Sequence, residues 1–167
     1  MPKIIENLRE QLLSEAKKQV KERGYAATTV RSVAGACGVG VGTVYNYFKS
    51  KEMLVATFVY DDWKIHLAEM ERLPDESHAR LSGIYGSLRR FAEENAELFS
   101  DADAAKSVSV GGEERHKLLR RQIASFVRPL CAEDFTAEFL AEALIRWSVE
   151  QTEFAAVYPI LEKIIKK

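Results

Sequence analysis

Apolar residues recur at intervals of three and four along nearly the whole chain, and this spacing predicts amphipathic helices. No stretch shows the strict alternation of apolar and polar residues that is typical of a half-buried strand. Glycine and proline, which interrupt helices, are scarce and clustered, with nine and four copies. We therefore expect an all-α protein of about nine helices, three in an N-terminal head and six in a C-terminal helical bundle.

Helix-breaking residues set the expected bounds of these helices. Gly24 ends a first helix that begins near Lys3. Pro74 stops a long fourth helix that begins at Lys51, where Ser50 can act as the cap. The later helices are expected at about 76–94, 96–104, 113–130, 136–157 and 159–167, with Pro159 opening the last and a loop at 107–112.

The most specific pattern in the chain is residues 28–53, TTVRSVAGACGVGVGTVYNYFKSKEM. A first short helix places its valines and Cys37 on one apolar face, and Gly38 suits the turn that follows because glycine accepts a positive φ. Val44 and Phe48 lie four residues apart on the inner face of a second short helix. This arrangement predicts a helix-turn-helix, whose second helix can enter the major groove of DNA.

The same segment resembles the DNA-binding signature of the tetracycline-repressor (TetR) family of bacterial regulators. The resemblance covers about the first third of the chain, and the rest matches the family in length and helical pattern. Gly40 departs from it, since such proteins commonly carry a serine there to cap the second helix. The matching residues are Gly24-Tyr25, Thr29-Val30-Arg31, Val33-Ala34, Gly38-Val39, Gly42-Thr43-Val44-Tyr45, Tyr47-Phe48 and Ser50-Lys51-Glu52-Met53-Leu54.

Such a resemblance implies a ligand-responsive transcriptional regulator, in most cases a repressor. It would bind a near-palindromic double-stranded DNA operator as a homodimer and leave it when a small apolar or aromatic effector binds. We accordingly expect residues 1–50 to bind DNA and residues 51–167 to bind the effector and to dimerise. A helical protein-interaction module without specific DNA binding is the alternative hypothesis.

The distribution of charge agrees with a DNA-binding head. The chain as a whole carries a formal net charge of −1. Residues 1–52, however, hold nine Lys and Arg against five Asp and Glu, whereas the remainder holds fifteen against twenty. A basic head on an acidic body suits a protein that meets phosphates with one end only.

Several side chains of the head are chemically suited to DNA. Asn46 can pair with the N6 and N7 edge of adenine, and Arg31 with O6 and N7 of guanine. Lys51, at the positive end of the fourth helix, is expected to contact a phosphate. Lys49 either contacts a phosphate or is only solvated, and Tyr45 either contacts DNA or belongs to the core of the head. The predicted DNA-binding residues are Thr29, Arg31, Thr43, Tyr45, Asn46, Tyr47, Lys49 and Lys51.

Aromatic and apolar residues of the body are more numerous than one inward stripe requires. For each of them, packing in the core competes with a role in binding. The predicted effector-site residues are Trp63, His66, Phe91, Phe99, Phe126, Trp147, Glu150 and Phe154. The predicted dimer interface, on the last two helices, comprises Phe139, Ala143, Leu144, Trp147, Leu161, Ile164 and Ile165.

Other classes of protein find little support in the sequence. A di-iron bundle enzyme would need two Glu-x-x-His units, and only Glu113 with His116 fits, with Asp75 and His78 as a weaker pair. Two distant cysteines indicate neither a disulfide framework nor a zinc site, and Cys37 is expected to be a small buried residue. We expect no cofactor, no metal, no catalytic residues, no membrane segment and a cytoplasmic location.

Overall fold

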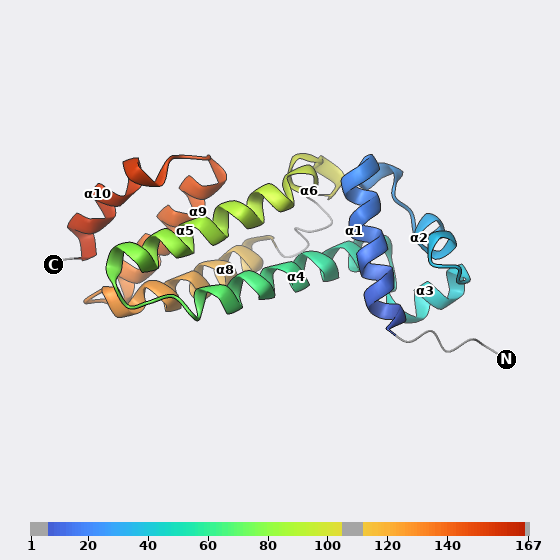
Figure 1. Cartoon of the computed structure of the whole chain (residues 1–167), viewed down its shortest axis with the longest axis horizontal. Helices are drawn as coiled ribbons and strands as arrows, with labels where there is room; N and C mark the ends of the chain where they lie inside the picture. Colours follow the sequence, from blue (N-terminus) through green and yellow to red (C-terminus); the bar gives the residue numbers. More distant parts are fainter. Residues whose placement is uncertain (1–6, 105–111, 166–167) are drawn as a thin grey trace. The chain divides into compact units, whose positions relative to one another are not determined.

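The computed structural model describes residues 7–104 and 112–165, and every regular element within those ranges is a helix (Figure 1). The predicted all-α class is therefore confirmed. None of the helices in these ranges combines the length and the apolar character needed to cross a bilayer. The elements are α1 (Leu8–Ala27), α2 (Val30–Ala36), α3 (Val41–Tyr47), α4 (Lys51–Met70), α5 (Ser77–Glu94), α6 (Ala96–Ser100), α8 (Gly112–Val127), the 3-10 helix η1 (Arg128–Leu130), α9 (Asp134–Val149) and α10 (Phe154–Ile165).

The chain divides into two compact units, which we describe separately. Unit 1 comprises residues 1–62 and 95–110, and unit 2 comprises residues 63–94 and 111–167. The division falls inside α4, so this one helix supplies residues to both units. The boundary at residue 50 inferred from the sequence concerns function and stays a prediction.

Unit 1 is built around α1, on which α2 and α6 pack. Its buried stripe follows the predicted spacing, with Leu12, Ala16 and Val20 almost inaccessible to solvent. Gly24 breaks the helical backbone with φ 82° and ψ 167°, which glycine accepts without steric cost, and this break is the predicted end of the first helix. The predicted start at Lys3 lies outside the described residues.

The turn between α2 and α3 has the predicted form. Gly38 adopts φ 67°, and the N–H of Val39 donates to the carbonyl of Ala34 at 3.0 Å. Gly40 is the N-cap of α3 and supplies no side-chain hydrogen bond. Cys37 differs from expectation, because it ends α2 at the edge of the turn and is only partly buried. Partial burial is the main cause of a raised pKa of its thiol, and the nearby Glu15 carboxylate raises this pKa further.

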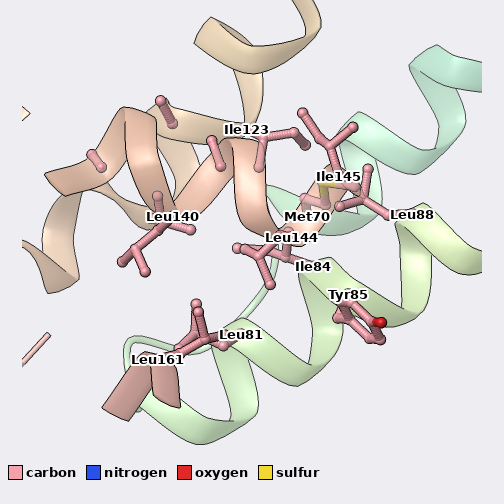
Figure 2. Packing of buried hydrophobic residues seen from close by; sticks show 14 of the residues in the cluster. Met70, Leu81, Ile84, Tyr85, Leu88, Ile123, Leu140, Leu144, Ile145 and Leu161 are labelled. Atoms are coloured by element: carbon pink, nitrogen blue, oxygen red, sulfur yellow. The ribbon is translucent and has the colours of Figure 1, made fainter. Parts of the chain in front are cut away.

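Unit 2 has one apolar core, to which α4, α5, α8, α9 and α10 contribute (Figure 2). The largest packed pairs of helices are α8 with α9 and α5 with α9. Ile84, Ile123 and Leu144 have no exposed surface, so each fills space between helices. Arg80 is buried at the edge of this core and donates to the carbonyls of Pro74, Leu73 and Phe126 at 3.0, 3.0 and 3.2 Å.

One expected helix, at 136–157, is in fact two helices. The backbone leaves the helical path after Val149, Gln151 adopts φ 58°, and α10 begins at Phe154. The hydroxyl of Tyr85 donates to the carbonyl of Thr152 at 2.6 Å, which holds the break against α5. Pro159 therefore lies inside α10 and does not begin a helix.

The remaining differences are shorter helices than expected. Helix α4 ends at Met70, because Pro74 disfavours helical backbone before it. Helix α6 ends at Ser100, where the carboxylate of Asp101 accepts the N–H groups of Asp103 and Ala104 and starts a new turn. Residues 107–111 of the expected loop lie outside the described residues, and its last residue begins α8.

A truncation in the core of unit 2 should be far more costly than one on its surface. We expect Leu144→Ala to lower the free energy of unfolding by about 2–5 kcal/mol, through lost burial and a residual cavity. Leu118, on α8, is 51 % exposed, so Leu118→Ala is the matched control. This substitution should change the free energy of unfolding by about 0.5 kcal/mol or less. Denaturant titrations at equal protein concentration measure both values, and equal losses would contradict this description of the core.

Candidate nucleic-acid interface

Helix α3 directs its aromatic and amide side chains outward. Val44 is fully buried and Phe48, the C-cap, is 3 % exposed, so the apolar pair faces inward as predicted. Tyr45 and Tyr47 are 45 % and 44 % exposed, and Asn46 between them is exposed as well. Tyr45 therefore lies on the surface of unit 1 and not in its core.

The start of α2, close to Arg31, is held by a reciprocal cap. Thr29 Oγ1 accepts the N–H of Ser32 at 3.0 Å, and Ser32 Oγ accepts the N–H of Thr29 at 3.0 Å. The buried side chain of Gln19 accepts the Ser32 hydroxyl at 2.6 Å and so ties the cap to α1. Arg31, one residue into the helix, is exposed.

A surface hollow of about 600 Å³ lies within unit 1 beside these elements. Arg31 and Lys49 both line it and are both exposed, and neither is paired with a carboxylate among the residues that the structure describes. Thr43 of α3 is partly exposed. The hollow is thus lined by cations and by residues with hydroxyl groups, which are the side chains that commonly contact phosphates. The lining residues are Thr28, Thr29, Val30, Arg31, Val41, Tyr45, Lys49, Ser50, Lys51 and Glu52.

Lys51 also lines the hollow, but its ammonium group is directed at Tyr25. The Nζ atom donates to the Tyr25 carbonyl oxygen at 2.9 Å and lies 3.7 Å from the centroid of the Tyr25 ring. The expected phosphate contact would therefore have to compete with two contacts inside unit 1.

The carboxylate of Glu52 is held at the first turn of α4. Hydrogen bonds from its own backbone N–H and then from the Ser50 hydroxyl lower the pKa of this carboxyl group, with smaller contributions from Tyr25 and Lys51. The Tyr25 hydroxyl donates to Glu52 Oε1 at 3.3 Å. Ser50 caps α4 as predicted, since its Oγ accepts the N–H of Met53 at 3.1 Å.

The predicted effector-site residues fall into separate groups. In unit 2 the Phe91 ring lies 5.0 Å from Trp63 and 5.6 Å from His66, centroid to centroid. Trp63 Nε1 also donates to Gln122 Oε1 at 2.9 Å. Phe126 and Trp147 are partly buried against the same apolar core.

The other three predicted effector-site residues have different surroundings. Phe154 packs at 5.5 Å from the Tyr85 ring and 5.6 Å from the Tyr158 ring. Glu150 is exposed at the end of α9, where it pairs with Arg146. Phe99 is 43 % exposed and belongs to α6 of unit 1.

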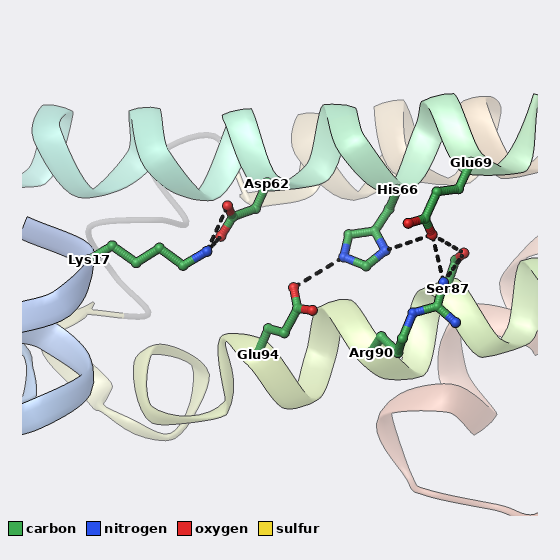
Figure 3. Close-up of polar contacts among 7 residues, drawn as sticks. All are labelled: Lys17, Asp62, His66, Glu69, Ser87, Arg90 and Glu94. Atoms are coloured by element: carbon green, nitrogen blue, oxygen red, sulfur yellow. Dashed lines mark hydrogen bonds and ion pairs between the residues drawn. The ribbon is translucent and has the colours of Figure 1, made fainter. Parts of the chain in front are cut away.

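Polar contacts of α4 reach a different partner helix in each unit (Figure 3). In unit 1, Lys17 Nζ lies 2.8 and 2.7 Å from the two carboxylate oxygens of Asp62. In unit 2, the buried His66 places Nε2 at 3.2 Å from Glu94 Oε2. Glu69 makes an ion pair with α5, and the hydrogen bond from Arg90 is the main reason that its pKa is lowered.

The predicted dimer residues also divide into exposed and buried ones. Phe139 is 51 % exposed, and Phe135, one turn earlier on α9, is 78 % exposed. Leu144 and Leu161 have no exposed surface, so both belong to the core of unit 2, and their assignment to an interface was wrong. Ala143, Trp147, Ile164 and Ile165 are partly buried.

The residues considered as metal ligands make other contacts. His116 Nε2 lies 2.9 Å from Glu142 Oε2, and Asp75 forms an ion pair with Arg80 at 2.6 Å. His78 packs edge-on against Tyr158. Within the described ranges, no three His, Cys, Asp or Glu side chains gather as a bound metal ion would require.

Comparison with known proteins shows what the N-terminal part of the chain resembles. A sequence model described as "Bacterial regulatory proteins, tetR family" matches residues 12–57, which include α2, α3 and the start of α4. The HTH-type transcriptional repressor KstR2 of Mycolicibacterium smegmatis is 31% identical over 107 residues, 60% of this chain and 51% of that protein. Residues 12–57 of the chain are thus similar to the tetR family of bacterial regulatory proteins.

Further comparisons find a second curated relative and a solved structure of similar fold. The HTH-type transcriptional regulator CymR of Pseudomonas putida is 30% identical over 103 residues, 59% of this chain and 47% of that protein. The chain thus spans about half the length of the curated relatives it matches. A tetR-family transcriptional regulator from Pectobacterium atrosepticum shares the fold, with a TM-score of 0.66 and 22% identity over 95% of this chain and 94% of that one. Each of these proteins is named as a transcriptional repressor or regulator.

Some residues of this chain were missed by reasoning from sequence. Gln19 falls on the buried stripe of α1, three residues after Ala16, and its place in that stripe was the available signal. Thr28 is buried and its hydroxyl donates to the Gly24 carbonyl at 2.9 Å. Phe135 was missed as a candidate interface residue, although its spacing of four from Phe139 places both on one face of a helix.

The lowered pKa of Glu52 predicts a pH-dependent contribution to the stability of unit 1. The pKa of Glu52 in the folded state lies below the ordinary value of 4.5. Glu52 therefore stabilises the fold above pH 4.5, and this stabilisation is lost as the pH falls through the folded-state pKa. Glu52→Gln should therefore be less stable than the wild type near neutral pH, and the difference should vanish in acid. Thermal unfolding across pH measures this, with Glu22→Gln, an exposed change on α1, as control. A difference that persists in acid would contradict the assignment.

Proposed function

We propose that this chain is a transcriptional repressor that binds a near-palindromic operator as a homodimer and releases it when a small apolar or aromatic effector binds. The observation that carries the proposal is the exposed face of α3 next to the hollow lined by Arg31 and Lys49. Exposed tyrosines and an amide lie beside two cations that have no carboxylate partner in the part of the chain that the structure describes, and such groups suit a surface that follows a sugar-phosphate backbone and reaches bases.

Each exposed group has a distinct role in this proposal. Asn46 lies between two outward tyrosines on α3 and reads an adenine through its amide. Tyr47 and Thr43 donate hydroxyl groups to phosphates along the groove wall. Arg31 and Lys49 supply positive charge at the hollow, and Arg31 is also long enough to reach a guanine.

Regulation by an effector would use α4, the helix that contributes to both units. Asp62 is bound by Lys17 in unit 1, and the next residue, Trp63, is bound by Gln122 in unit 2. An effector that displaces Phe91 from Trp63 and His66 would change the packing of α4 in unit 2. Since α4 continues into unit 1, effector and operator would then compete with a coupling free energy of about 1–3 kcal/mol. The relative KstR2 is named as a repressor, which supports the sign of the regulation.

Selection of duplexes from a random DNA pool tests the proposal directly. At about 0.15 M salt we expect two inverted half-sites whose centres lie about 10 base pairs, or a multiple, apart. Asn46→Ala should relax the preference at one base pair per half-site and weaken binding by about 1–3 kcal/mol. Ser14→Ala, an exposed change on α1, should do neither. Recovery of no motif by a folded protein would favour the protein-interaction module.

The dimer surface is expected to include the exposed face of α9. Phe135 and Phe139 are both exposed, lie one turn apart, and so form a continuous apolar surface. Phe139→Asp would place a charge in the interface and should yield a monomer by light scattering. Phe99→Asp changes a similarly exposed phenylalanine on α6 and should leave the dimer intact. A dimer that survives Phe139→Asp would place the interface elsewhere.

A further inference from the structure

Tyr25 is bound by the first two residues of α4. Its ring is 5 % exposed, and the positive φ of Gly24 just before it turns the chain so that this ring packs inside unit 1. The ammonium group of Lys51 lies over the ring and hydrogen-bonds the Tyr25 carbonyl, and the Tyr25 hydroxyl reaches Glu52. We call these three residues the clasp.

In the clasp, the positive charge of Lys51 is bound by Tyr25 within unit 1. A cation over an aromatic face and a hydrogen bond to a carbonyl oxygen are both favourable contacts, and both restrict the lysine side chain. Glu52, the next residue, is held as a carboxylate and offsets part of the positive charge. Arg31 and Lys49, by contrast, are exposed and have no carboxylate partner within the described ranges.

The clasp joins two segments that both line the hollow. Residues 28–31 follow Tyr25 closely in the chain, and residues 49–52 include Lys51 and Glu52. Fastening Tyr25 to the start of α4 therefore restricts how far the segment that carries Arg31 can move from the segment that carries Lys49.

We propose that Lys51 is a positioning residue, which with Tyr25 sets the width of this hollow, and that Arg31 and Lys49 neutralise the DNA phosphates there. This inference rests on the proposed DNA-binding function. It differs from the expectation based on the sequence, in which Lys51 itself contacts a phosphate. The two assignments differ in how binding depends on salt, because each phosphate that a cation neutralises adds to the salt slope.

The test compares lysine variants on duplex DNA of mixed sequence, with affinity measured by fluorescence anisotropy over a range of salt. A neutralised phosphate adds about 0.9 to the slope of log K against log salt, so Lys49→Met should reduce the slope by about that amount per protomer. Lys51→Met should weaken binding about threefold to tenfold, the equivalent of losing a cation–π contact and a hydrogen bond, with little change in slope. Lys21→Met, on α1 away from the hollow, gives the effect of losing one charge alone.

A second variant keeps the test decisive if Lys51→Met folds poorly by circular dichroism. Lys51→Gln is neutral but keeps a side-chain N–H that can donate to the Tyr25 carbonyl, so it should bind more tightly than Lys51→Met at the same slope. If both variants lose as much slope as Lys49→Met, Lys51 is a phosphate ligand and the inference is overturned. If the folded wild type shows no salt-dependent affinity for DNA, the proposed function itself fails and the inference fails with it.

Discussion

The surface that faces DNA in our proposal depends on the burial of two side chains, Val44 and Phe48. A helix of seven residues is too short to be stable alone in water, so α3 keeps its shape only because these side chains pack inside unit 1. Helix α2 is equally short and shares this dependence. Helix α2 packs on the buried stripe of α1, where Gln19 binds Ser32, and α3 packs on α2.

Unit 2 is stabilised differently, by a larger apolar core and a few buried polar groups. Arg80 satisfies three backbone carbonyls near the end of α4 and the end of α8, and Tyr85 satisfies a fourth at the break after α9. These contacts fix loops that have little apolar surface of their own. The exposed part of α9, with Phe135 and Phe139, is available for association.

Local patterns predicted the fold well, and long-range contacts set the limit of that prediction. The inward and outward faces of α3 follow from a spacing of four residues, and the turns at Gly24 and Gly38 follow from glycine chemistry. The direction of Lys51 depends on Tyr25, 26 residues earlier, which periodicity cannot reveal. The break at Gln151 was missed for a similar reason, because it is held by Tyr85 from another helix. Leu144 and Phe139 look alike in sequence and differ only in what packs over them.

The uncapped start of α3 has a consequence for how operators would be found. Gly40 offers no side chain to the first turn, and Gly42 adds a second residue of high backbone freedom to the same turn. The first turn of α3 can therefore lose order at small cost while Val44 stays buried. Under the proposed function, such a helix would remain frayed on unrelated DNA and move along the backbone, and it would become fully ordered only where the bases fit. Specific binding would then have a more negative heat capacity change and a less favourable entropy than non-specific binding to the same phosphates.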